Sequence, residues 1–137
     1  MQRVIDWGRL VRAWAVIVVI ELAACAAFYL PFIEVFRRVD AGFTTTAWAI
    51  RVTGFVALAF FFVLIYATSL PPAENPIALG ARFGITVGAF VLSGYVIGFS
   101  FGKMSTAALG VHAVGSLIKF LVAGIVTSYL YRPRLSR

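Results

Sequence analysis

Residues 10–32 read LVRAWAVIVVIELAACAAFYLPF, an apolar run in which Arg12 and Glu21 are the only charged residues. A membrane-spanning helix needs about 20 predominantly apolar residues, because a rise of ~1.5 Å per residue has to cover ~30 Å of hydrocarbon. The strand of a membrane barrel would instead alternate polar and apolar residues over about ten positions, and this stretch does not. We therefore predict a helix that crosses a membrane.

Three later stretches are comparably long and apolar, namely residues 47–70, 82–101 and 105–131. Arg51 lies near the start of the first of them, and Lys119 lies at the middle of the last. Three prolines fall between the second and third predicted spans, where no continuous helix would accommodate them. The sequence thus predicts an all-α integral membrane bundle of four transmembrane helices, with residues 1–137 forming a single membrane domain.

The composition agrees with a membrane protein. The chain is 62% hydrophobic and 12% charged, and its mean hydropathy is +0.99. Soluble domains are about half apolar and about a quarter charged, so polar surface is too scarce here to cover a water-soluble globule. The net charge of +7 is spread over loops and tails, whereas a nucleic-acid-binding face would gather basic residues in one place. We expect the lipid bilayer as a partner and no nucleic acid.

The distribution of basic residues predicts the orientation. Cytoplasmic loops of membrane proteins carry an excess of Lys and Arg. Seven arginines fall on the side that holds both termini: Arg3, Arg9, Arg12, Arg82, Arg132, Arg134 and Arg137. Four basic residues fall on the other side: Arg37, Arg38, Arg51 and Lys103. We therefore predict that the N and C termini are cytoplasmic.

Glu21 and Lys119 are ionisable residues close to the centres of their predicted spans. Such a group costs about 2.5–3.5 kcal/mol at the bilayer centre on insertion scales, so it normally finds a partner. The first and last spans are antiparallel in a four-span chain, which places both residues at similar depth. We predict an ion pair, within one chain or between subunits. It would act either as a static pin between two helices, which is the simpler interpretation, or as a proton-linked site in transport.

His112 and Ser116 extend a polar stripe along the helix that carries Lys119, and Cys25 shares a helical face with Glu21. Glu21, Lys119, His112 and Ser116 are therefore candidates to line a transport path. Ordinary hydrogen bonding between helices, at about 0.6 kcal/mol per contact, is the simpler alternative. One histidine and one cysteine cannot supply the four ligands of a closed zinc site. We expect no metal, no cofactor, no catalytic residues and no enzymatic activity.

Glycines recur in and around the third predicted span as two triplets, each spaced by four residues: Gly80, Gly84 and Gly88, then Gly94, Gly98 and Gly102. At about 100° per residue all six fall on a stripe about 120° wide. Small residues let another helix approach closely, which is how membrane helices associate. The stripe predicts helix packing, against a neighbour in the same chain or against another copy. We favour a homo-oligomer, since four thin helices offer little interior of their own.

Two resemblances bear on function. The part of the chain from residue 66 to residue 131 resembles small bacterial membrane proteins of four helices without an assigned activity, through Leu79-Gly80-Ala81-Arg82-Phe83-Gly84, Ala123-Gly124-Ile125-Val126 and Leu130-Tyr131-Arg132-Pro133. That resemblance implies an architecture and the bacterial inner membrane, but no activity. The chain is also similar to small multidrug-resistance transporters in its size, its four spans and a glutamate in the first. It departs from them in a longer first loop and in Lys119, which would neutralise that glutamate, so their function is not carried over.

These features favour an oligomeric protein of the transport or permeation type. The alternative is a non-catalytic accessory or structural subunit of a larger membrane complex, which would use the glycine stripe and apolar faces for docking. A membrane enzyme is third, because the chain has so few reactive groups.

Overall fold

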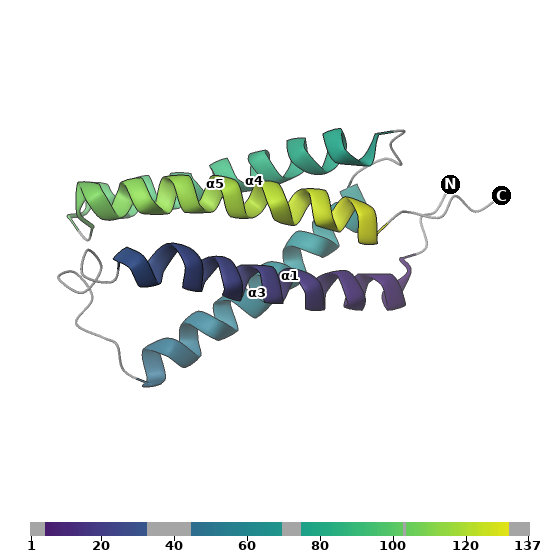
Figure 1. The fold of residues 1–137 in the computed structure, drawn as a ribbon, viewed down its shortest axis with the longest axis horizontal. Coiled ribbons are helices and arrows are strands. Elements are labelled where there is room, and N and C mark those ends of the chain that lie inside the picture. Colours follow the sequence, from purple (N-terminus) through teal and green to yellow (C-terminus); the bar gives the residue numbers. More distant parts are fainter. Residues whose placement is uncertain (1–4, 33–44, 70–74, 103, 132–137) are drawn as a thin grey trace.

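The structure is a computed structural model that describes residues 5–32, 45–69, 75–102 and 104–131. Its elements are α1 (Trp7–Tyr29), the short 3-10 helix η1 (Leu30–Phe32), α3 (Thr45–Ser69), α4 (Pro76–Ser100) and α5 (Thr106–Leu130) (Figure 1). Within these ranges, four helices are long and apolar enough to cross a membrane. The predicted all-α fold with four transmembrane helices is confirmed, and the chain is an integral membrane protein.

Capping residues set where three of the helices begin. The side chains of Asp6, Asn75 and Ser105 accept hydrogen bonds from backbone N–H groups three residues on, at the starts of α1, α4 and α5. These caps satisfy N–H groups that the first helical turn leaves free. α4 begins at Pro76, six residues before the predicted start, because proline is well accommodated at the first position of a helix. The proline that we assigned to a loop therefore opens the helix.

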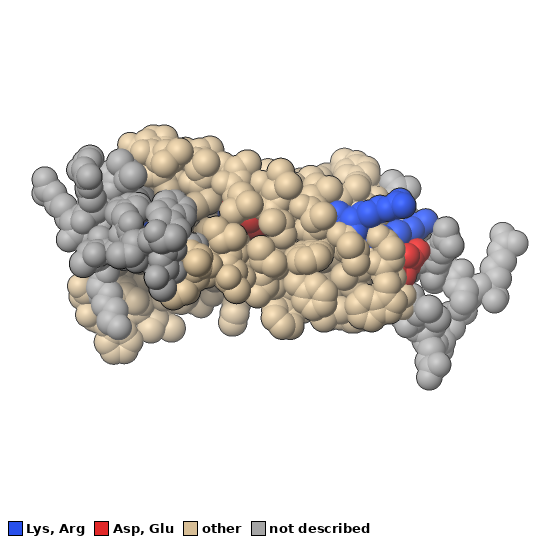
Figure 2. All heavy atoms as spheres, turned by 90° about the horizontal axis from the view of Figure 1, so that it is seen from below, with Lys and Arg blue, Asp and Glu red and all other residues tan. Residues whose placement is uncertain are grey.

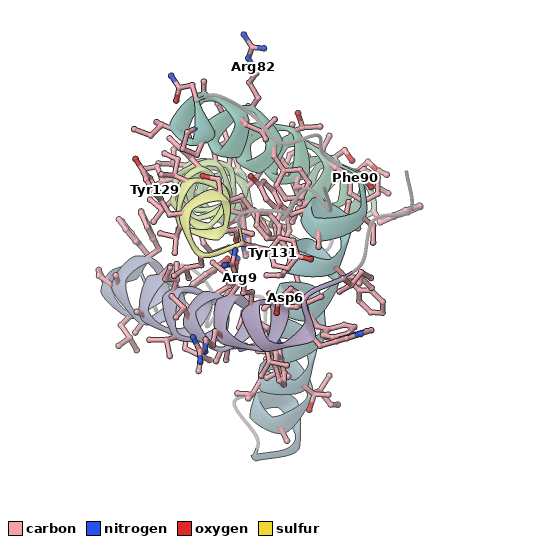
Figure 3. The ribbon with its side chains drawn as sticks, turned by 90° about the vertical axis from the view of Figure 1, so that its right-hand side faces the viewer. Asp6, Arg9, Arg82, Phe90, Tyr129 and Tyr131 are labelled. Carbon is pink, nitrogen blue, oxygen red and sulfur yellow. The ribbon has the colours of Figure 1, made fainter. Side chains whose placement is uncertain are left out.

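The helices form a bundle that is closed toward the Ser69 end of α3, where Phe62 and Tyr66 contact Phe83 of α4, and open toward its Thr45 end (Figure 1). α5 packs against α4 on one side and α1 on the other, and α3 packs mainly against α1. α1, α4 and α5 lie lengthwise, whereas α3 crosses α1 obliquely and its Thr45 end leaves the other helices (Figures 1 and 3). α1 begins and α5 ends at the same end of the molecule. We call this the Trp7 end, and the opposite one the Tyr29 end.

The apolar core fills the half of the molecule toward the Trp7 end. Its fully buried members come from the first half of α1, the second half of α3 and the second half of α5; they include Leu10, Ala13, Ile17, Phe62, Val63, Phe120 and Ala123. Phe62 packs between Phe83 of α4 and Phe120 of α5, with ring centroids 4.7 and 5.7 Å away. The indole Nε1 of Trp14 donates to the carbonyl oxygen of Val56 at 3.0 Å, which ties α1 to α3 where they cross.

Glycines bring the backbones of α4 and α5 into direct contact. A Cβ atom on Gly84 would meet the carbonyl of Phe120, and one on Gly124 would meet the carbonyl of Gly80 and lie 2.8 Å from the nitrogen of Gly84. A Cβ on Gly88 would lie 3.3 Å from the Cβ of Phe120. The first three glycines of the predicted stripe thus pack as expected, inside the chain. Gly124 of α5 is a fourth member that the stripe did not include.

The later glycines of the stripe have no such neighbour. Among the described residues, nothing lies within 4 Å of a Cβ built on Gly94, Gly98 or Gly102. On an ideal helix Gly98 and Gly102 have the same angular positions as Gly80 and Gly84, which precede them by 18 residues or five turns. The face of α4 that contacts α5 drifts around the helix from Gly80 through Gly88 to Tyr95, which stacks on His112 of α5, so the stripe meets α5 only in the first half of α4. Packing of Gly94 and Gly98 against another copy stays a prediction.

Substitution of single glycines by alanine tests which glycines pack against a neighbouring helix. Gly84→Ala and Gly124→Ala should each destabilise the protein by about 1–3 kcal/mol, because the added methyl group forces two backbones apart. Gly94→Ala is the matched control on α4 and should change stability by less than about 0.5 kcal/mol. Unfolding by SDS in mixed micelles, followed by tryptophan fluorescence, measures the difference. Equal losses for Gly84→Ala and Gly94→Ala would contradict the packing of α4 described above.

Candidate functional site

Glu21 of α1 and Lys119 of α5 form an ion pair inside the helical bundle. The Nζ atom of Lys119 lies 2.7 Å from Oε2 of Glu21, and the two side chains are only 8% and 1% exposed. The predicted contact is confirmed, and it forms within one chain. The middle of the face in Figure 2 is almost wholly uncharged, and its described Lys and Arg side chains gather at the Trp7 end. The pair is thus a buried exception in a largely apolar belt.

Helical periodicity places the two charges opposite each other. The buried residues of α1 are Leu10, Ala13, Ile17 and Glu21, so the glutamate continues the stripe that faces the other helices. The Lys119 ammonium also lies 4.7 Å from the ring centroid of Phe120 and 5.4 Å from that of Phe55 on α3. Aromatic faces attract cations at such distances. Residues of three helices therefore enclose the ammonium group.

The second carboxylate oxygen of Glu21 has a different environment. Both oxygens are buried and neither meets hydrogen-bond geometry with a described residue, but Oε2 has the ion-pair contact with Lys119, which leaves Oε1 as the oxygen more open to a further partner. An unsatisfied buried polar group costs about 1–3 kcal/mol, and more when it is charged. A proton, a water molecule or a hydrogen-bonding solute at Oε1 would remove this penalty. The carboxylate is thus both anchored by Lys119 and able to accept a further partner.

A second polar cluster lies at the Tyr29 end. The Tyr29 hydroxyl is 2.6 Å from Nδ1 of His112, and the His112 ring stacks on Tyr95 with centroids 4.1 Å apart and planes 13° from parallel. The three side chains come from α1, α5 and α4. His112 therefore does not touch the ion pair, which lies two helical turns away. Hydrogen bonding and stacking connect the three helices here.

The contact surface between α1 and α5 has two unlike halves. Toward the Trp7 end it is apolar and fully buried, with Leu10, Ala13 and Ile17 of α1 in the core. Toward the Tyr29 end it carries polar side chains; we call this part the polar half-seam, and it consists of Glu21, Cys25 and Tyr29 on α1 with Lys119 and His112 on α5. Cys25 and Tyr29 are only partly buried. The oblique path of α3 accounts for the difference. α3 packs on the other helices toward its Ser69 end, at the Trp7 end of the molecule, and runs away from α1 toward its Thr45 end (Figure 1).

The four predicted path residues thus fall into different surroundings. Glu21 and Lys119 touch, His112 belongs to the tyrosine cluster, and Ser116 is buried on the side of α5 that faces Gly88 of α4. Sequence reasoning did not identify Tyr29 or Tyr95 as site residues. A usable signal for Tyr29 was its position four residues after Cys25, which is itself four residues after Glu21, so that the three side chains follow one another along one side of the helix.

A polar contact also closes the Trp7 end. The backbone N–H of Asp6 donates to the Tyr131 hydroxyl at 3.2 Å, and the Asp6 carboxylate lies 3.3 Å from the Arg9 guanidinium. Figure 3 shows Asp6, Arg9 and Tyr131 together where α1 begins and α5 ends, whereas Arg82 on α4 points away. Within the described ranges, no three His, Cys, Asp or Glu side chains lie close enough to hold a metal ion. The chemistry of the described site is that of charge, hydrogen bonding and stacking.

A double-mutant cycle measures how much the ion pair contributes. Glu21→Gln and Lys119→Met should each destabilise the protein by about 3–5 kcal/mol, because each leaves one charge buried without its partner. The double variant should lose at least about 1 kcal/mol less than the sum of the two. SDS unfolding of all four proteins gives the coupling free energy. Strict additivity would show that the two charges do not stabilise each other.

We compared the chain with protein-family models, with curated proteins and with solved structures, and none of the three comparisons returned a match. The buried ion pair, the polar half-seam and the tyrosine cluster are the features of the molecule that bear on its function. All three belong to the surface on which α1 meets α5.

Proposed function

We propose that this chain is a small transport or permeation protein, and that the Glu21–Lys119 pair is its proton-linked exchange site. One observation carries the proposal: Glu21 is buried, its Oε2 atom is paired with Lys119, and its Oε1 atom accepts no hydrogen bond from the described part of the chain. Ionisable residues within membrane spans are costly, and they commonly mark ion pathways and proton relays.

A purely structural pair is a weaker explanation of this geometry. Buried ion pairs repay the cost of desolvation only where additional hydrogen bonds satisfy the remaining lone pairs. The lone pairs of Oε1 are not satisfied within the described residues. An oxygen that binds a proton or a hydrogen-bonding solute in one state, and releases it in another, accounts for this arrangement.

Protonation of Glu21 would act on the helices through Lys119. A neutral carboxyl group loses its charge–charge attraction to the ammonium, which would then be held mainly by the faces of Phe120 and Phe55. The contact between α1 and α5 would weaken at this point. Binding of a proton would therefore shift the population toward a looser arrangement of the two helices.

Orientation, location and assembly belong to the same proposal. Arg9, Arg12 and Arg82 lie in the early turns of α1 and α4. We propose that this end faces the cytoplasm, in the bacterial inner membrane, and that the chain works as a homo-oligomer. We further propose that it has no enzymatic activity.

Proton flux into liposomes tests the exchange site. With the pH dye pyranine trapped inside and a potassium diffusion potential as driving force, Glu21→Gln should reduce the flux at least about tenfold, since it removes the group that binds the proton. Asp6→Asn is the matched control: it also neutralises a carboxylate, and asparagine remains a good helix cap. Flux that is equal in wild type and Glu21→Gln, or that falls equally in Asp6→Asn, would refute the role of Glu21.

An accessory subunit of a larger membrane complex is the second candidate. Uncovered helix faces favour this role, because α4 packs mainly on α5 and the first half of α3 leaves the other helices. Exposed side chains on these two segments include Ile50 and Phe90. A partner present in fixed stoichiometry in native membranes, and lost on Gly98→Leu but retained on Gly110→Leu, would support this role. Wild-type protein that purifies alone from gently solubilised membranes would contradict it.

A further inference from the structure

The cluster of Tyr29, Tyr95 and His112 lies directly beyond the polar half-seam. On α1, Tyr29 is four residues after Cys25 and eight after Glu21, which corresponds to ~6 and ~12 Å along the helix. On α5, His112 is seven residues before Lys119, or ~10.5 Å. A solute that entered between α1 and α5 from the Tyr29 end would meet the cluster first, then Cys25 and then the ion pair.

The opposite approach to the ion pair is blocked more firmly. Toward the Trp7 end the next residues are Ile17 on α1 and Phe120 and Ala123 on α5, all of them completely buried. Opening this region would expose closely packed apolar side chains from three helices. Opening the Tyr29 end would separate the Tyr29 hydroxyl from His112 and Tyr95 and move Phe28 away from Gly115. Phe28, Tyr29 and His112 are only partly buried, and a hydrogen bond between membrane helices contributes about 0.6 kcal/mol. The Tyr29 end is therefore the one that opens at lower cost.

The cluster is also positioned to couple helices. His112 is held by Tyr29 from one side, with a 2.6 Å contact, and by the parallel ring of Tyr95 from the other. α4 packs closely on α5 through Gly80, Gly84 and Gly124, and Tyr95 stacks on His112 further along the same two helices. Tyr29 joins this pair from α1, so its contact with His112 is the place where α1 would part from α4 and α5.

We propose that Tyr29, Tyr95 and His112 form a gate that closes the polar half-seam, and that water and the transported species reach Glu21 from the Tyr29 end. The species that passes is a proton or a small hydrogen-bonding solute, since it has to be accepted by a single carboxylate oxygen. This inference rests on the proposed role of Glu21 as an exchange site, but the gate can be tested without measuring transport.

Cys25 is a natural reporter of the gate, because it is the only cysteine of the chain and lies between the gate and the ion pair. A charged methanethiosulfonate reagent such as MTSET does not cross membranes and reacts with the thiolate, so it modifies Cys25 only where water reaches it. Membrane vesicles of both orientations, identified by the accessibility of a C-terminal tag, allow the reagent to be added from either end.

We expect slow modification of wild-type Cys25 from the Tyr29 end and none from the Trp7 end. Tyr29→Phe should raise the rate about three- to tenfold, the effect of losing one hydrogen bond that holds the gate closed. Tyr129→Phe makes the same chemical change near the far end of α5 and should leave the rate unchanged. Tyr95→Ala, which removes the stacking ring, provides a second route to an open gate and should also raise the rate.

Three results would overturn the gate: faster modification from the Trp7 end, no modification from either end, or equal rates in wild type, Tyr29→Phe and Tyr95→Ala. The proposed transport function fails separately. If modification follows the predicted pattern but Glu21→Gln leaves proton flux unchanged, the half-seam is gated and hydrated while Glu21 is not its exchange site.

Discussion

The ion pair between Glu21 and Lys119 is the constraint on which the arrangement of α1 and α5 depends. In hydrocarbon neither charge can turn toward the lipid without a cost of a few kcal/mol. A 2.7 Å contact at the middle of both helices therefore fixes their relative depth and rotation. The pairs on either side follow from this register in an antiparallel arrangement: Tyr29 meets His112 at one end, and Asp6 meets Tyr131 at the other. Sliding by one turn, ~5.4 Å, would break all three contacts together.

α4 and α3 are held to α5 and α1 by different contacts, which explains why the bundle is open toward the Thr45 end of α3. α4 is held to α5 by close backbone contact through Gly80, Gly84 and Gly124, where even a methyl group would collide. α3 is attached mainly where it crosses α1, through core packing and the bond from Trp14 to Val56. On the Thr45 side of the crossing α3 runs away from α1, and Phe55 is the α3 residue that still lies near Lys119 of the polar half-seam. The surface between α1 and α5 is thus apolar and closely packed toward the Trp7 end and polar toward the Tyr29 end. Such a surface suits a path that is entered from the Tyr29 end.

Much of this could be predicted from the sequence, because the bilayer imposes simple rules. Length and hydropathy were sufficient to predict the four spans. The free-energy cost of a charge in hydrocarbon was sufficient to predict that Glu21 pairs with Lys119. The division of the glycine stripe was not predictable, since it depends on how α4 lies across α5 and hence on which glycines stay in contact. Tyr29 and Tyr95 were also missed as site residues. A tyrosine near a span end is ordinarily a membrane-interface residue, and only the packing of α1, α4 and α5 shows that these two meet His112.

The most direct test is the distance between the two charged groups in a lipid bilayer. Solid-state NMR can measure the dipolar coupling between the side-chain 15N of lysine and the carboxyl 13C of glutamate. The chain has two lysines, Lys103 and Lys119, so Lys103→Arg leaves a single lysine signal. Because Nζ of Lys119 lies 2.7 Å from Oε2 of Glu21, we expect the carboxyl 13C to dephase the Lys119 signal strongly in the Lys103→Arg protein. When Glu21→Gln is added, this dephasing should disappear. A Lys119 signal that is not dephased by any glutamate carboxyl carbon would contradict the account.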